Sequence, residues 1–108
     1  MWGIDSLSFY KYERLISYFP VSIDTIVELP KNIKEFNFLF IETYSKNISY
    51  CHTIFFVPQL TIGIYSINHC SEPKAFIFFK MIESIKIQIT NCSPDMSINH
   101  IYGIKLLN

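Results

Sequence analysis

The sequence contains little glycine, with only Gly3, Gly63 and Gly103 among 108 residues. Phosphate-binding loops and dinucleotide-binding turns need several closely spaced glycines, because the backbone must approach the phosphates without a side chain in between. The three glycines lie far apart in the chain, so the sequence excludes both nucleotide-binding motifs.

Positive charge is equally sparse, since Arg14 is the only arginine and nine basic residues balance nine acidic ones. Proteins that bind nucleic acid neutralise phosphates with clustered lysine and arginine. The lysines are scattered along this chain, so we expect no nucleic-acid partner.

The sequence also lacks a long uninterrupted apolar run. The most apolar stretch, His52–Ile67, is interrupted by Pro58, Gln59 and Gly63, whereas a membrane-spanning helix needs about 20 apolar residues. The N-terminus, Met1–Asp5, has neither a basic leader nor an apolar core. We expect no membrane insertion, and a protein that is made and folded in a cytoplasm.

Metal-binding motifs are absent as well. Cys51–His52 and His69–Cys70 form two neighbouring pairs, and no C-x-x-C occurs. Zinc needs ligands that converge, but adjacent residues on a strand point to opposite faces of the sheet. We therefore expect no metal or other cofactor, and we interpret these residues as small buried thiols and imidazoles at loop edges.

Catalytic signatures are equally weak. Cys51, His69 and Asp95 would supply a nucleophile, a base and a carboxylate on paper. No local motif such as G-x-S-x-G surrounds any cysteine or serine, and the acidic residues are spread singly. The sequence thus favours a binding protein over an enzyme.

Apolar side chains, in contrast, are abundant. They make up 50% of the chain, aromatic residues make up 17% and charged residues 17%, against about 25% charged residues in ordinary domains. A chain of this length forms one hydrophobic core, so we predict a single domain over residues 1–108. The apolar excess predicts a surface that contacts a partner subunit or a ligand.

Period-two alternation dominates the chain and predicts strands. Ile85, Ile87 and Ile89 alternate with polar residues, which indicates a strand with one buried face. The aromatic-rich segment Phe36–Ile41 is apolar on both faces, so we expect a central or covered strand there. Further strands are predicted at Thr25–Leu29, Thr53–Val57, Thr61–Ile67, Ala75–Phe79 and Ile98–Leu106. Short strands separated by turns are typical of an all-β fold, here a small antiparallel β-sandwich or jelly-roll-like domain.

The segment Asp5–Phe19 is ambiguous. Tyr12, Leu15, Ile16 and Phe19 fit the helical i, i+3, i+4, i+7 spacing, and Pro20 would end a helix there. A short helix and a strand both remain open for this segment.

Two apparent loops, Tyr44–His52 and Asn68–Lys74, combine aromatic and short polar residues. Aromatic rings stack on sugars and short polar side chains satisfy hydroxyl groups. On this basis Tyr44, Tyr50 and His69 are the predicted ligand-binding residues. The alternative interpretation is ordinary solvated loops.

Residues 15–106 resemble a known family. The stretch Thr25–Tyr44 (T-I-V-E-L-P-K-N-I-K-E-F-N-F-L-F-I-E-T-Y) resembles the "T-I-T-L-S-x-S-I-x-N-Y-D-x-L-I-I-x-Y" pattern of the C-terminal, receptor-binding tip domain of bacteriophage and prophage tail fibre proteins. A segment ending in Val57-Pro58 follows, and the chain closes on Ile101-Tyr-Gly-Ile-Lys105, which is similar to the family's terminal "I-Y-G-I-K".

This resemblance implies a β-sandwich head without a cofactor, forming a homotrimer on a virion that contacts the host surface. The leading hypothesis is therefore a host-recognition or adhesion module that binds a host surface glycan or protein. The alternative is a structural virion protein, a capsid decoration or tail assembly piece, which binds other virion proteins and no host ligand. Within the last predicted strand, Gly103 indicates a bulge or a close backbone approach.

Overall fold

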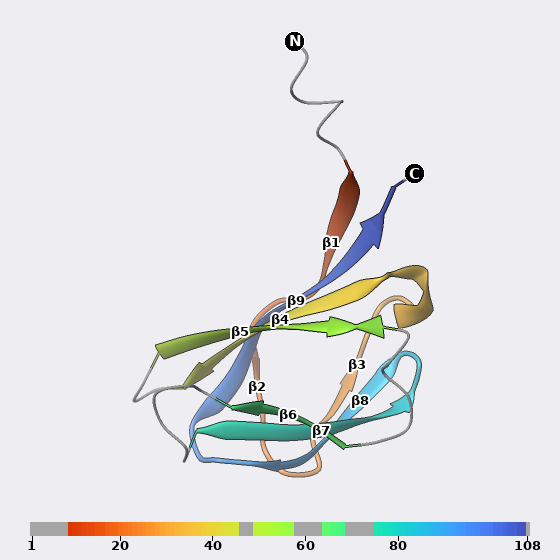
Figure 1. Cartoon of the computed structure of the whole chain (residues 1–108). Coiled ribbons are helices and arrows are strands. Elements are labelled where there is room, and N and C mark those ends of the chain that lie inside the picture. Colours follow the sequence, from red (N-terminus) through yellow and green to blue (C-terminus); the bar gives the residue numbers. More distant parts are fainter. Residues whose placement is uncertain (1–8, 46–48, 58–63, 69–74, 108) are drawn as a thin grey trace.

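The computed structural model describes residues 9–45, 49–57, 64–68 and 75–107, which form two antiparallel β-sheets packed face to face (Figure 1). The first, sheet A, contains β1 (Tyr10–Ile16), β2 (Phe19–Pro20), β4 (Phe38–Ser45), β5 (Ser49–Phe56) and β9 (Met96–Leu106). The second, sheet B, contains β3 (Ile26–Glu28), β6 (Ile64–Asn68), β7 (Phe76–Glu83) and β8 (Lys86–Cys92). A 3-10 turn, η1 (Ile33–Glu35), precedes β4. The predicted all-β sandwich is confirmed.

The strand order is β1-β9-β4-β5 in sheet A, with β2 also paired to β9, and β3-β8-β7-β6 in sheet B. Consecutive strands pair in β4–β5, β6–β7 and β7–β8. β1 and β2 follow each other within sheet A, where both pair with β9, and the remaining connections cross between the sheets. β4 is therefore an internal strand, as its apolar sequence predicted.

The N-terminal helix alternative is wrong over the described residues, because β1 and β2 are strands that pair with β9. A β-bulge between Arg14 and Ile16 adds Leu15 to β1 without a partner residue in β9. The extra residue shifts the alternation by one, so Leu15 and Ile16 both contact the core. A bulged strand thus reproduces the apolar spacing of a helix. Residues 5–8 lie outside the described residues.

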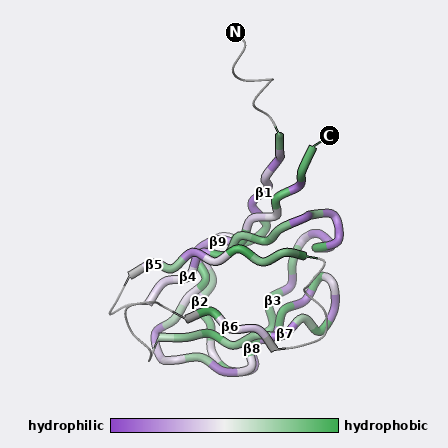
Figure 2. The backbone as a smooth tube through the Cα atoms, viewed as in Figure 1, coloured by the Kyte–Doolittle hydropathy of each residue, from purple (hydrophilic) through white to green (hydrophobic). Residues whose placement is uncertain are grey.

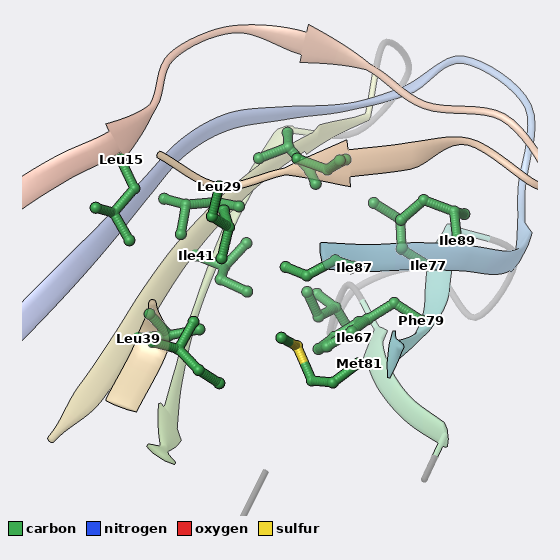
Figure 3. Close-up of a cluster of buried hydrophobic side chains, with 14 of the residues drawn as sticks. Leu15, Leu29, Leu39, Ile41, Ile67, Ile77, Phe79, Met81, Ile87 and Ile89 are labelled. Atoms are coloured by element: carbon green, nitrogen blue, oxygen red, sulfur yellow. The ribbon is translucent and has the colours of Figure 1, made fainter. Parts of the chain in front are cut away.

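The core lies between the sheets (Figure 3). Leu39 and Ile41 of β4 face sheet B, where Ile77, Ile87 and Ile89 face back toward them. All five side chains are buried. An aromatic cluster joins the sheets as well: the ring of Phe79 in β7 lies 5.4 Å from that of Phe55 in β5 and 5.6 Å from that of Tyr65 in β6. Packing of these inner faces is the main source of stability for such a domain.

Gly103 lies at a close approach of side chain to backbone. A Cβ built on this residue would lie 2.6 Å from Cδ1 and Cγ and 2.7 Å from Cδ2 of the Phe36 ring. The aromatic ring therefore packs directly on the backbone of β9. This confirms the close approach that the sequence predicted at Gly103.

Beyond β4, the strands β1 and β9 continue as a two-stranded ribbon that leaves the sandwich (Figure 1). The pairing of β1 with β9 extends along the ribbon as far as Tyr10 and Leu106. Beyond this pair, Leu107 N donates a hydrogen bond to Phe9 O at 2.8 Å. The side-chain amide oxygen of Asn37 accepts a hydrogen bond from Leu106 N, which fixes the base of the ribbon. The two ends of the described chain thus lie together at one end of the molecule. Over the residues described, no helix is long and apolar enough to cross a membrane.

Candidate functional site

The outer face of sheet A carries an unusual set of side chains. β4 shows the pattern clearly: Leu39, Ile41 and Thr43 are buried against the core, so the residues between them point outward. The register of the neighbouring strands extends this outer surface across the sheet. We call it the sheet A face; it comprises Tyr10, Tyr12, Arg14, Phe38, Phe40, Glu42, Tyr44, Tyr50, His52, Ile54, Phe56, His100, Tyr102, Ile104 and Leu106.

Aromatic rings contact one another across all four long strands of this face. Ring centroids lie 5.7 Å apart between Tyr12 and Tyr102, 6.3 Å between Tyr102 and Phe40, and 5.4 Å between Phe40 and His52. These separations are typical of favourable ring–ring contacts. The rings therefore form a continuous aromatic row from β1 through β9 and β4 to β5.

A polar cluster lies beside this row, with Glu42 at its centre. Glu42 is directly opposite His52 on one side and His100 on the other. His52 Nε2 lies 2.5 Å from Glu42 Oε2, and His100 Nε2 lies 3.9 Å from Oε1. A β-bulge next to Glu42 leaves Asn99 without a partner residue in β4, and Asn99 Nδ2 donates to Glu42 Oε1 at 3.2 Å. One carboxylate thus holds two imidazoles and an amide in place.

The carboxyl group of Glu42 titrates below its ordinary range. Partial burial by itself raises the pKa of Glu42. Hydrogen bonds from His52 and Asn99 and the charges of His52 and His100 lower the pKa, and together they outweigh the effect of burial. The net result is a pKa below the ordinary 4.5. The folded state therefore favours the ionised form of Glu42.

This shift predicts a pH dependence of stability. A lowered pKa in the folded state stabilises the fold above pH 4.5, and that contribution is lost as the pH falls through the folded pKa. Glu42→Gln should lower the free energy of unfolding by about 1–2 kcal/mol at neutral pH, because hydrogen bonds to a charged group are lost. Urea denaturation at pH 7 and pH 3 measures this effect. A gap between variant and wild type that does not shrink at pH 3 would contradict the assignment.

The structure brings together two of the three predicted ligand-binding residues. Tyr44 and Tyr50 are directly opposite each other near the end of the β4–β5 hairpin, and their ring centroids lie 5.0 Å apart. The prediction that Tyr44–His52 is a loop is wrong outside residues 46–48, since Tyr44 and Tyr50 lie on strands. His69, the third predicted residue, lies outside the described residues.

The sequence interpretation missed Glu42, Asn99 and His100 as part of this site. The available signal was the alternation Phe38-x-Phe40-x-Glu42-x-Tyr44, which puts a carboxylate among aromatic residues on one face of a strand. The cluster forms through pairing of residues that are far apart in the sequence, so the alternation alone does not show its partners.

The sheet A face divides into two parts along its strands. We call Glu42, Tyr44, Tyr50, His52 and His100 the hairpin end, because they lie toward the β4–β5 turn. The opposite part lies next to the ribbon, where Phe38 pairs with Ile104. The hairpin end is therefore the part of the face that lies away from the two chain ends (Figure 1).

The outer face of sheet B has a different character. Lys86 lies 3.1 Å from Glu83 and 3.9 Å from Glu28, and Gln88 and Lys80 are register neighbours. Charged and amide groups of this kind are ordinary solvated surface. This face also carries a pair of rings, Phe76 and Phe78 of β7, with centroids 5.1 Å apart. A row of rings that crosses four strands thus distinguishes the sheet A face.

Among the described residues, no group of three or more His, Cys, Asp and Glu side chains is arranged to hold a metal ion. The Glu42 cluster is held together by hydrogen bonds and by the ion pairs of Glu42 with His52 and His100. Cys51 and Cys92 are partly buried, and burial raises the pKa of the Cys92 thiol. A raised pKa keeps that sulfur in the thiol form, which is a poor nucleophile.

Comparison with known protein families found no match for this chain, and comparison with curated proteins likewise found none. Its function is therefore inferred from the sheet A face itself.

Proposed function

We propose that this chain is a binding module that recognises a host surface glycan as part of a phage virion, and that the hairpin end is its binding surface. The observation that carries the proposal is the Tyr44–Tyr50 ring pair, with half-buried Tyr44 and exposed Tyr50, beside the Glu42 cluster. The chain acts by binding, without a cofactor or a catalytic step.

The chemistry of the hairpin end fits a sugar. Rings of Tyr44 and Tyr50 offer apolar faces on which a pyranose ring stacks. His52 and His100 offer ring nitrogens, and Glu42 offers carboxylate oxygens, which bond to hydroxyl groups. Tyr50 is 56% exposed, so a ligand reaches its ring without any rearrangement of the fold.

The position of the hairpin end also supports display on a particle. Both ends of the described chain lie at the ribbon. A domain held to a virion through that side presents the β4–β5 hairpin outward. A shallow surface of this kind binds each sugar weakly, and several copies on one particle raise the overall avidity.

The resemblance to tail fibre tip domains supports the virion setting and the homotrimer, both of which remain proposals. The protein would be synthesised in the cytoplasm of the infected host and carried in the particle. Its receptor would then be a bacterial surface glycan.

A structural virion protein is the second candidate. The apolar part of the sheet A face next to the ribbon favours it, because such a surface also suits contact with capsid or tail proteins. Staining of intact host cells by the purified chain supports the first candidate. Co-purification with virion proteins without any staining supports the second.

The binding test uses immobilised bacterial lipopolysaccharides and teichoic acids as probes. We expect Tyr50→Ala to weaken binding of the retained probe about tenfold, since the loss of one aromatic stacking contact costs about 1 kcal/mol or slightly more. Ile26→Ala serves as the control, because Ile26 is 51% exposed on β3 of sheet B. Equal binding by both variants, or no retained probe at all, would contradict the proposal.

A further inference from the structure

The part of the sheet A face next to the ribbon is a continuous apolar surface. We call it the apolar patch; it comprises Tyr10, Tyr12, Phe38, Phe40, Ile54, Phe56, Tyr102, Ile104 and Leu106. None of these side chains is charged, and they span β1, β9, β4 and β5. Figure 2 shows hydrophobic colouring at the C-terminal end of β5 and at the C-terminal end of β9. Four strands therefore contribute to one uncharged surface.

This patch is largely open to solvent. Tyr12 is 67% exposed and Ile54 is 61% exposed, and Tyr10, Phe56 and Leu106 are also exposed. An aromatic side chain has an area of about 150–250 Å². When the exposed fractions of the nine side chains are applied to areas of this size, the exposed area of the patch is on the order of 600–700 Å². That area exceeds the largest apolar patch of most monomers, about 300–600 Å², and approaches the roughly 800 Å² per partner of a stable protein interface.

The patch is also hollowed where the ribbon meets the sandwich. A shallow cleft of about 220 Å³ is lined by Tyr10, Tyr12, Phe40, Tyr102 and Ile104. Phe9 and Leu107 are also exposed, at the tip of the ribbon. The same chain thus carries an apolar cleft and a protruding apolar tip.

Two features at the border of the patch favour the idea that it is covered in the assembled protein. The ribbon continues beyond β4 as two strands, and an isolated pair of strands is marginally stable in water. β5 is an edge strand of sheet A, yet its sequence S-Y-C-H-T-I-F-F contains no lysine or proline. Natural proteins guard open edges with such residues, as β1 does with Lys11 and Arg14. An edge without them is typical of a strand that is covered in the assembled protein.

We propose that the apolar patch is a self-association surface, and that its occupant is another copy of this chain. The interface area is close to what a stable assembly needs, and the patch brings no like charges together when two copies meet. The net charge of zero removes long-range repulsion between copies. This proposal is independent of the glycan site, which lies at the other end of the face.

The test is the solution mass of the full chain by light scattering at micromolar concentrations. Wild type should have at least twice the chain mass of 12.7 kDa. Ile54→Lys should weaken association about 30-fold or more, because a lysine becomes buried without a partner. The matched control is Ile26→Lys, which changes the same residue type on β3, an edge strand of sheet B, and should leave the mass unchanged.

A second variant, Tyr12→Lys, places the charge on β1 at the opposite edge of the patch and should also reduce the mass. Circular dichroism and thermal unfolding confirm that each variant is folded. A monomeric wild type would overturn the proposal, as would equal effects of Ile54→Lys and Ile26→Lys. Patch variants that no longer associate but still bind glycan through the hairpin end would support the proposal. Such a result would also separate self-association from the proposed function.

Discussion

Gly103→Val is expected to destabilise the domain by about 3 kcal/mol or more, because a well-packed site cannot accept the added atoms without strain. The new Cβ would lie 2.6 Å from two atoms of the Phe36 ring, a separation that real Cβ atoms essentially never show. Either the ring or β9 must move, and β9 lies between β1 and β4 in sheet A. Urea denaturation measures the loss as a lower midpoint with an unchanged slope.

A double-mutant cycle identifies the cause of that loss. Gly103→Ala should cost about 1–3 kcal/mol by the same overpacking, and Phe36→Ala should cost its own share of lost contacts. When both substitutions are combined, the alanine at position 103 no longer meets the ring. The combined loss should therefore be smaller than the sum of the two single losses. Additive losses would show that the Phe36 ring is not the obstacle.

Phe79→Ala is the second substitution for which we expect a large effect, a loss of about 3–5 kcal/mol. Phe79 is buried, and its ring contacts Phe55 of the opposite sheet and Tyr65 of the neighbouring strand. Removing the ring leaves a cavity between the sheets and ends both aromatic contacts. A loss of this size is a large fraction of the 5–15 kcal/mol of total stability that is usual for a domain.

Phe78→Ala is the matched control for this prediction. Phe78 is the preceding residue on β7, so its side chain points to the outer surface of sheet B, where its ring contacts that of Phe76 at 5.1 Å. Its truncation should cost about 1 kcal/mol, because little core volume is lost. Thermal unfolding of the two variants compares them directly. Equal losses for Phe78→Ala and Phe79→Ala would contradict the assignment of inner and outer faces.

Strands with regular alternation could be predicted from the sequence. Ile87 and Ile89 alternate with polar residues, and both are buried in β8. Phe36–Ile41 correctly indicated an internal strand, although β4 begins at Phe38 and ends at Ser45. In both cases one residue in two faces the core, which a period-two pattern shows without knowledge of the partner strand.

The segments that were predicted wrongly depend on contacts outside the local pattern. The bulge at Leu15 is set by the register between β1 and β9, and the segment alone then resembles a helix. Tyr44, Tyr50 and His52 resembled loop residues because polar neighbours surround them, whereas the cross-strand pairing makes them strand residues. The Glu42 cluster likewise depends on the pairing of β4 with both β5 and β9.

The terminal stretch Ile101–Lys105 carries the most specific part of the tail fibre resemblance, and the fold gives each of its first four residues a role. Ile101 is fully buried, and Gly103 lies under the Phe36 ring. Tyr102 and Ile104 point to the opposite side and line the cleft of the apolar patch. The motif is thus explained by packing and by the surface we propose for self-association, while the virion role rests on the proposal above.

The most direct test of the binding surface is chemical-shift mapping by NMR with the saccharide retained in the binding screen. We predict that the largest shifts occur at Glu42, Tyr44, Tyr50, His52 and His100, with small shifts on the outer face of sheet B. Saturable shifts confined to the hairpin end would support the account. Shifts centred on sheet B, around Lys80, Lys86 and Gln88, would contradict it.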